Sequence, residues 1–262
     1  MRALHTAATG MMAQELNVQV ISNNIANMRT TGYKRQRAEF QDMLYEQIRR
    51  VGTQTSAQGN VLPAGVELGS GVKTVGTPRI MTQGTLLPTQ KDLDVAIRGD
   101  GFFRVLLPDG RTAYTRDGSF ELDSQGRIVT AQGYVVQPGI TVPNNSSGLT
   151  INAQGQVSVM QPGQTAPTQV GQLELSLFVN RAGLQALGDN LYLETPASGT
   201  PQTGQPGNDA FGNLQQGNLE QANVEAVNEI TDLIAAQRAY EMNAKVITAA
   251  DQMLQSSSQM MR

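Results

Sequence analysis

The residues best suited to catalysis are few in this chain of 262 residues. His5 is the single histidine, and one histidine can neither complete a catalytic triad nor hold a zinc ion without distant partners. We interpret it as an ordinary residue in the first turn of a helix. The chain has no cysteine, which excludes disulfides, thiolate metal sites and cysteine nucleophiles together.

Two further patterns stop short of a ligand site. Gly99 and Gly101 could begin a dinucleotide-binding loop, but Arg104 stands where the pattern needs a third glycine. Asp92 and Asp94 could begin a calcium loop, but the acidic residue and the glycine that should follow are missing. The sequence therefore predicts no cofactor and no small-molecule substrate.

Clustered carboxylates leave one enzymatic alternative open. Asp109, Asp117, Glu121 and Asp123 lie close together in the sequence, and a hydrolase that acts on the cell wall would use two such groups. These residues fall at predicted turns, where Asp hydrogen-bonds the local backbone. A wall-binding module whose helices dimerise is the other alternative to a structural protein.

The composition is that of a folded protein that does not bind nucleic acid. Hydrophobic residues make up 39% of the chain and charged residues 16%, which is too apolar for disorder. A net charge of −3 lacks the basic excess of a nucleic-acid binder. No apolar run is long enough to span a membrane, and the N-terminal residues lack the apolar core of a signal peptide. We expect any export to proceed without a cleaved signal peptide.

Residues 3–28 are predicted to form a helix with an apolar stripe. Gly10 interrupts good helix formers, so we expect it to permit the close approach of a neighbouring helix. The alternative is an amphipathic helix that packs on the core of its own domain. The stripe repeats every seven residues at Leu4, Met11, Val18 and Ile25, and Ala7, Ile21 and Met28 broaden it.

A second and longer helix is predicted over residues 219–256. No glycine or proline follows Asn218, so the helix can run for about 55–60 Å without a break. Gln237 and Asp251 interrupt its stripe, as residues that set register often do. The stripe again repeats every seven residues, at Leu219, Ala226, Leu233, Tyr240, Ile247, Leu254 and Met261.

The composition of the middle of the chain is typical of a β domain. Residues 52–218 are rich in Gly, Pro, Asn, Gln and Thr, and short strand-like runs alternate with turn residues. The fold class is therefore α+β, with paired coiled-coil-like terminal helices around an antiparallel β-rich middle. The predicted strands are 93–98, 102–107, 112–115, 120–122, 134–137, 156–160 and 173–179.

A bridge joins the first helix to the β domain. Gly32 can take a positive φ and end the helix. The spacing of Phe40, Leu44 and Ile48 predicts a short amphipathic helix, and residues 51–71 are expected to be extended. The predicted domains are a terminal helical domain of 1–29 with 219–262, a connecting segment of 30–71, and a β-rich domain of 72–218.

The two stripes predict self-assembly. They are wider than a two-helix seam, so pairing the helices with one another would leave more apolar surface exposed than a monomer tolerates. Contacts between copies would cover this surface, and a head-to-tail contact whose rotation does not close produces a helical filament. We expect the assembly interface to include Leu4, Met11, Val18, Ile25, Leu233, Tyr240, Ile247 and Leu254.

Four motifs follow one another along the chain. They are Ser-Asn-Asn-Ile-Ala-Asn at 22–27 with Thr-Thr-Gly-Tyr-Lys at 30–34, Gly-Asp-Gly-Phe-Phe at 99–103, Tyr-Thr-Arg-Asp-Gly-Ser-Phe at 114–120, and the terminal segment 222–254. In this order they resemble the motifs of the flagellar rod and hook axial proteins. The resemblance covers essentially the whole chain. The residues that carry it include Asn24, Asn27, Thr31, Gly32, Tyr33, Lys34, Gly101 and Phe102.

This resemblance implies a structural protein rather than an enzyme. It implies a tube around an export channel, with terminal helices inside and the β domain outside, that crosses the periplasm to the outer membrane and transmits torque. The implied partners are copies of the chain, proximal rod proteins, hook protein, the surrounding P- and L-ring proteins and the flagellar type III export apparatus. The chain length and segment 34–72 favour the distal rod, with a stiffening insertion, over the hook or proximal rod.

Overall fold

The computed structural model describes residues 2–50, 64–146, 148–162, 166–208 and 210–260. The chain forms two compact units. The helical unit combines residues 1–25, 36–78 and 225–262, and the β unit combines residues 26–35 and 79–224. Among the described residues, no helix is both long enough and apolar enough to cross a membrane.

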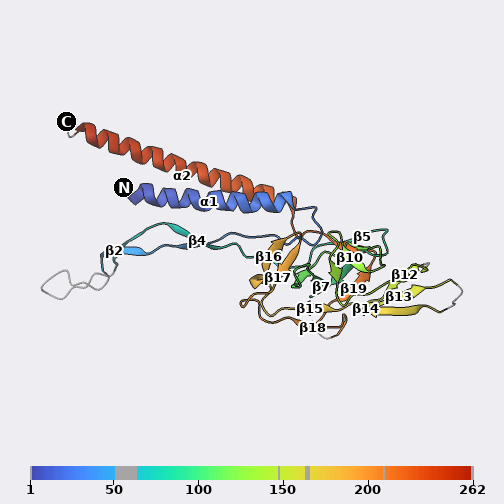
Figure 1. Cartoon of the computed structure of the whole chain (residues 1–262). Helices are drawn as coiled ribbons and strands as arrows, with labels where there is room; N and C mark the ends of the chain where they lie inside the picture. The colour runs from blue at the N-terminus through green and yellow to red at the C-terminus, as the bar shows by residue number, and fades with distance from the viewer. Residues whose placement is uncertain (1, 51–63, 147, 163–165, 209, 261–262) are drawn as a thin grey trace. The chain divides into compact units, whose positions relative to one another are not determined.

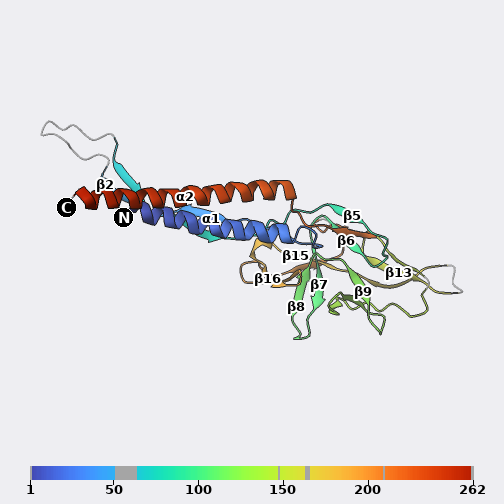
Figure 2. The ribbon, with the colours of Figure 1, turned by 90° about the horizontal axis from the view of Figure 1, so that it is seen from above.

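Two long helices dominate the helical unit and lie side by side (Figure 1, Figure 2). Helix α1 is Arg2–Ala26 and helix α2 is Ala226–Met260. They run antiparallel, because Asn24 meets Glu229 near one end of the pair while Gly10 meets Asn243 further along. The prediction of paired terminal helices is confirmed.

The start of the second helix was predicted too early. Leu219 lies in β20 (Asn218–Glu220), which pairs antiparallel with β5 (Leu86–Pro88). The backbone hydrogen bonds of this pairing replace the helical ones, so α2 begins seven residues later, at Ala226. The seven-residue spacing continued into the strand without a helix to support it.

Small side chains let α1 and α2 approach closely. A Cβ atom on Gly10 would lie 2.9 Å from the Nδ2 atom of Asn243, so the amide of this α2 side chain lies directly against the glycine. Gly10 thus leaves room for a side chain of the neighbouring helix, as predicted. The buried residues of α1 are Ala7, Thr9, Ala13, Val20, Ile21 and Asn24, and those of α2 are Glu229, Ala236 and Ala250.

The predicted short helix around Phe40, Leu44 and Ile48 is wrong, because this segment forms strands. Strand β1 (Glu39–Asp42) pairs with β4 (Val72–Gly76), and β2 (Tyr45–Arg49) pairs with β3 (Val66–Gly69). Leu44 and Ile48 are 88% and 60% exposed, so the spacing does not mark one buried face. Of the predicted extended segment 51–71, residues 51–63 lie outside the described part, and β3 is extended as expected.

The β unit is built on a nine-stranded antiparallel sheet. Its main path runs β16 (Gln185–Gly188), β17 (Leu191–Leu193), β8 (Thr112–Thr115), β7 (Phe102–Leu106), β11 (Val135–Val136), β10 (Ile128–Thr130) and β9 (Phe120–Leu122). Strand β15 (Leu175–Leu177) joins β7 to β18 (Gln202–Gly204).

Smaller pairings complete the unit. They are β12 (Gly148–Ile151), β13 (Gln156–Met160) and β14 (Thr168–Gln172) in one sheet, and β6 (Val95–Arg98) with β19 (Asn213–Gln216). A short 3-10 helix covers Arg181–Gly183. Each of the seven predicted strand runs contains a strand, which confirms the antiparallel β-rich middle.

The β unit has a hydrophobic core of its own. Phe103 and Phe120 meet edge to face at 5.0 Å within the largest cluster, which also holds Val95 and Leu175. A second cluster forms around Phe102, whose ring meets those of Phe178 and Tyr192 edge to face. Such pairs add specificity to the apolar burial, so the unit can fold around them.

Candidate functional site

The segment that follows α1 makes a tight turn at Gly32. The φ of this glycine is +68°, and a Cβ atom there would lie 2.9 Å from the backbone carbonyl carbon of Arg116 and the backbone nitrogen of Asp117. The Gly32 N–H donates to the carbonyl oxygen of Glu220 at 2.7 Å. Only glycine can therefore take this conformation and this close approach without strain.

Lys34 and Glu220 form a wholly buried ion pair. The Nζ of Lys34 donates to Oε1 of Glu220 at 2.5 Å and to the carbonyl oxygen of Thr82 at 2.8 Å. The same Oε1 accepts the N–H of Gly84 at 2.9 Å. Burial lowers the pKa of Lys34 from its ordinary value, and the adjacent Glu220 carboxylate acts against this shift. The pair ties the segment after α1 to the strand before α2.

Arg116 is the third charged member of this cluster. Its Nε lies 3.7 Å from Oε2 of Glu220, and its Nη2 donates to the carbonyl oxygen of Gly99 at 2.8 Å. Burial lowers the pKa of Arg116, and the Glu220 carboxylate opposes this shift. We name Lys34, Arg116 and Glu220 the ionic clasp. Its three charges lie apart in sequence and share one buried place in the β unit.

The second glycine motif lies beside the ionic clasp. The guanidinium carbon of Arg116 lies 5.6 Å from the centre of the Phe102 ring, within cation–π range. Gly101 has φ +141°, and a Cβ atom there would lie 3.0 Å from Cδ1 of Leu175. Two motif residues from different parts of the chain thus come together at this place, because Lys34 shares its partner Glu220 with Arg116 and Phe102 lies against Arg116.

The other motif residues of the turn are also held by hydrogen bonds or packing. The carbonyl oxygen of Thr31 accepts a hydrogen bond from Nδ2 of Asn190 at 3.0 Å. Asn27 accepts two hydrogen bonds from Thr30, one at its backbone oxygen at 3.0 Å and one at Oδ1 at 3.2 Å. Tyr33 is half-buried and lines a surface hollow. These contacts give the motif residues structural roles.

Asn24 plays a separate part inside the helical unit. Its Oδ1 accepts the N–H of Gln36 at 2.9 Å, and its Nδ2 donates to the carbonyl oxygen of Gln36 at 2.9 Å and to Oε2 of Glu229 at 3.1 Å. Asn24 is buried, so these three bonds satisfy its amide. The side chain joins α1 to α2 and to the chain that returns from the turn.

The predicted interface residues flank the seam between the helices. Leu4, Met11, Val18, Ile25, Leu233 and Ile247 are half-buried, whereas Tyr240 and Leu254 are 44% and 46% exposed. Val18 and Tyr240 line an open groove between α1 and α2. We name it the helix groove, and its residues are Glu15, Val18, Gln19, Gln237, Tyr240 and Glu241.

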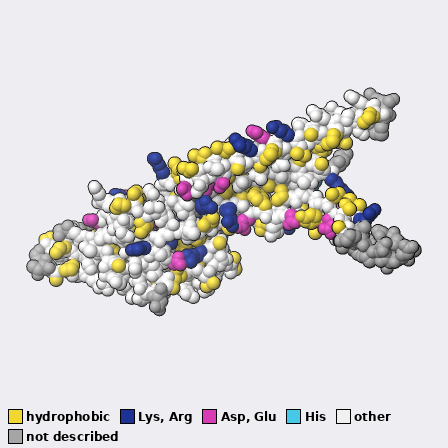
Figure 3. All heavy atoms as spheres, turned by 180° about the vertical axis from the view of Figure 1, so that it is seen from behind, with side chains coloured by type: hydrophobic (Ala, Val, Ile, Leu, Met, Phe, Trp, Pro, Cys, Tyr) yellow, Lys and Arg dark blue, Asp and Glu magenta, His cyan; other side chains and the backbone are white. Residues whose placement is uncertain are grey.

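Large apolar side chains remain open to solvent on the helices. Figure 3 shows hydrophobic side chains spread along them on the face it draws. Removing apolar surface from water is favourable by about 25 cal/mol per Å² before the entropic costs of association are subtracted, which makes these side chains candidates for contacts between copies. The exposed residues are Met12, Val227, Ile230, Ile234, Met242, Val246, Met253 and Met260.

Three family models match successive parts of the chain. The model of the flagella basal body rod protein matches residues 4–34, that of the flagellar hook protein FlgE/F/G D1 domain matches 96–159, and that of the flagellar basal body rod FlgEFG protein C-terminal matches 215–260. The flagellar basal-body rod protein FlgG of Caulobacter vibrioides is 57% identical over 99% of this chain and 99% of that protein. The chain belongs to the FlgG family.

More distant FlgG proteins match over the same span. That of Buchnera aphidicola from Acyrthosiphon pisum is 50% identical over 98% of this chain and 99% of its own length, and that of Bacillus subtilis is 37% identical over 97% of each. The flagellar hook protein FlgE of Helicobacter pylori is 42% identical over 52% of this chain but only 19% of its own length. The family is structural, so the prediction that the chain is no enzyme is confirmed.

The ionic clasp draws one residue from each matched segment of this FlgG-family chain. Lys34 ends the first, Arg116 lies in the second and Glu220 lies in the third. Sequence reasoning singled out Lys34 but missed Glu220, because a glutamate in a short strand gives no signal of burial. Arg116 stood within a quoted motif, and its charge next to buried aromatic residues was the available clue.

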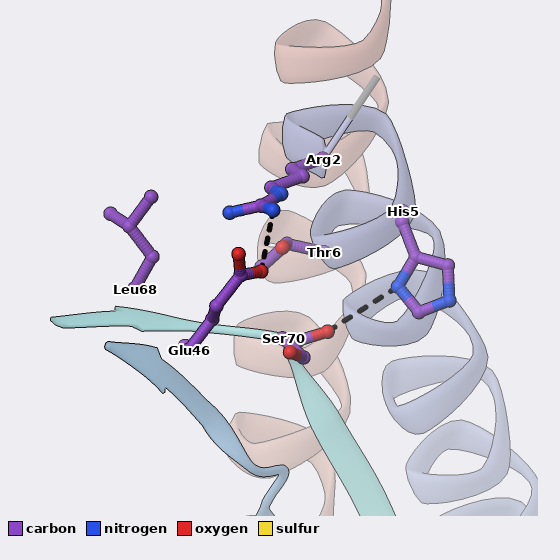
Figure 4. Close-up of a pocket in the computed structure, with 7 residues that line it drawn as sticks. Arg2, His5, Thr6, Glu46, Leu68 and Ser70 are labelled. Atoms are coloured by element: carbon purple, nitrogen blue, oxygen red, sulfur yellow. Dashed lines mark hydrogen bonds and ion pairs between the residues drawn. The ribbon is translucent and has the colours of Figure 1, made fainter. Parts of the chain in front are cut away.

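The pocket at the start of α1 holds no catalytic triad (Figure 4). Serine, histidine and glutamate are all present, yet Nδ1 of His5 lies 3.3 Å from the backbone oxygen of Ser70, and Glu46 is paired with Arg2 at 2.5 Å. A triad would need the serine hydroxyl on the imidazole and the carboxylate on its other nitrogen. Among the described residues, no cluster of His, Asp and Glu could hold a metal ion.

Proposed function

We propose that the protein is a subunit of the distal part of the flagellar rod. Copies polymerise into a stiff, hollow helical shaft that transmits torque to the hook and lets exported proteins pass through its channel. The terminal helices form the inner wall, and the β unit forms the outside. This assignment places the chain between the proximal rod proteins and the hook protein.

The extent of the sequence match carries this proposal. FlgG rod proteins align with nearly the whole chain and with nearly their whole length, whereas the hook protein aligns with about half the chain and a fifth of itself. The remaining family members, the proximal rod proteins, are the second candidate.

The helical unit supports polymerisation. Ile230, Ile234 and Met242 on α2 are each between 46% and 60% exposed, although α2 is packed on α1. Large exposed apolar side chains that recur along a helix in this way favour a protein interface. We assign the interface role to Leu4, Met11, Val18, Ile25, Leu233, Tyr240, Ile247 and Leu254 as residues that line or flank this surface.

The partners and location follow from this role. The shaft would run from the periplasm to the outer membrane inside the P- and L-rings, and its subunits would reach the growing end through the flagellar type III export apparatus without a cleaved signal peptide. The absence of cysteine suits a chain that passes unfolded into an oxidising space, because no wrong disulfide can form there.

Electron microscopy of the concentrated, purified chain tests the proposal. We expect hollow helical tubes with the β units on the outside. A closed dimer with lytic activity on cell wall would overturn the structural assignment. Tubes that bend as readily as a hook would overturn the assignment to the distal rod while keeping the family.

A further inference from the structure

The C-terminal end of α2 has no partner within the described part of the chain. The register set by Asn24 with Glu229 and by Gly10 with Asn243 places Arg2, the start of α1, level with residue 251. Every residue from Asp251 to Met260 is exposed. We name residues 251–260 the overhang.

The overhang carries apolar side chains with nothing to cover them. Met253, Leu254 and Met260 are 65%, 46% and 82% exposed. Asp251 is its single charged residue, and its other polar residues are Gln and Ser. An isolated helical end of this length is marginal in water, because tertiary packing supplies most of the stability of a helix. The overhang therefore needs an apolar surface that can also accept hydrogen bonds.

The helix groove is such a surface. Val18 and Tyr240 supply its apolar walls, while Glu15 and Glu241 supply carboxylate oxygens that accept hydrogen bonds. The amides and hydroxyls of Gln252, Gln255 and the neighbouring serines are donors that suit these acceptors. Apart from Asp251 at its base, the overhang carries no charge that Glu15 and Glu241 would repel.

We propose that the overhang of one copy docks in the helix groove of the next copy. The inference rests on the proposed function and specifies one of its contacts. The overhang cannot reach the groove of its own chain, because about 28 Å of helix separates the levels of Leu254 and Val18. The contact joins two different surfaces, so it repeats from copy to copy and extends a filament.

The geometry fixes the step between the two copies. The middle of the overhang lies about seventeen residues beyond the middle of the helix groove along α2, a distance of about 25 Å. For two copies in the same orientation, the contact therefore needs a shift of about 25 Å along the helix axis. A helical reconstruction reports this shift directly.

Engineered cysteines test the contact, since the chain has none of its own. Val18→Cys and Leu254→Cys proteins are mixed under assembly conditions and oxidised. A disulfide needs Cα atoms within about 7 Å. A cross-link between residue 18 of one protein and residue 254 of the other therefore requires the overhang to lie in the helix groove of another copy. Lys245→Cys replaces Val18→Cys in the control, because Lys245 lies on the side of α2 opposite the buried Ala236.

The outcomes separate this inference from the proposed function. We expect tubes in which the Val18→Cys and Leu254→Cys proteins cross-link and the control pair does not. Tubes without this cross-link, or with equal cross-linking of the control pair, overturn the docking contact and leave the proposed function standing. The failure of wild-type protein to form tubes, with no cross-link in the mixture, contradicts both.

Discussion

Replacing Gly32 with alanine should destabilise the β unit by more than a backbone effect alone. A left-handed conformation costs an alanine about 1–2 kcal/mol, and Gly32 has φ +68°. The added methyl group would also meet backbone atoms of Arg116 and Asp117 at 2.9 Å, which cannot move aside as a side chain could. Overpacking of this kind costs about 1–3 kcal/mol.

Gly133 provides the matched control. Its φ is +85°, and a Cβ atom there would meet nothing within 4 Å, so Gly133→Ala carries the backbone cost without the clash. Urea unfolding followed by near-ultraviolet circular dichroism of the buried Tyr114 and Tyr192 measures both variants. We expect Gly32→Ala to lose about 1–3 kcal/mol more than Gly133→Ala. Equal losses in the free energy of unfolding would refute the close approach between the turn at Gly32 and the backbone of Arg116.

Three further predictions concern the ionic clasp, the exposed apolar side chains of α2 and the segment of residues 46–66. Between the lowered pKa of Lys34 and its ordinary value of 10.5, the unfolded chain binds more protons than the folded one, so the free energy of unfolding should rise with pH in this window. A pH series of urea midpoints should show this rise in the wild type but not in Lys34→Met, and identical profiles would argue against burial of the ammonium group. Ile230→Asp with Ile234→Asp should abolish tubes in electron micrographs while the free energy of unfolding stays within about 1 kcal/mol of wild type, because both side chains are exposed and each such substitution changes it by about 0.5 kcal/mol or less. Normal tubes would exclude this face from the interface. Deleting residues 46–66 should give a more flexible polymer, measured as increased curvature in micrographs, and unchanged stiffness would count against the distal rod.

The long helices were predictable because their signal is long and periodic. The seven-residue spacing from Leu4 to Ile25 and the absence of glycine after Asn218 located both helices to within a few residues, except at Leu219. The spacing did not reveal which stripe is buried. Ala236 and Ala250 lie in the seam, while the larger Tyr240 lines the helix groove, since close packing selects small side chains.

The ionic clasp and the strand pairs β1–β4 and β2–β3 could not be predicted, because both depend on contacts between residues that lie far apart in the sequence. Phe40, Leu44 and Ile48 fit a helical spacing, yet their segment pairs with strands that lie roughly twenty to thirty-five residues later in the chain. Glu220 became a buried acid only because Lys34, some 186 residues away, lies beside it. The helix or strand propensity of a short segment does not depend on which distant residue will lie beside it in the fold, so it cannot predict such a contact.

The ionic clasp gives Lys34, in the motif at residues 30–34, a structural role. Removing one member of a buried ion pair costs about 3–5 kcal/mol when the other is left uncompensated. Lys34 and Glu220 therefore hold together the segment that follows α1 and the strand that precedes α2.

A helical reconstruction of tubes grown from the purified chain would test the proposed role of the protein. We expect a hollow tube whose channel is lined by α1 and α2, with the β unit outside and neighbouring copies shifted by about 25 Å along the helix axis. A closed oligomer, or a tube whose channel is lined by the β unit, would contradict it.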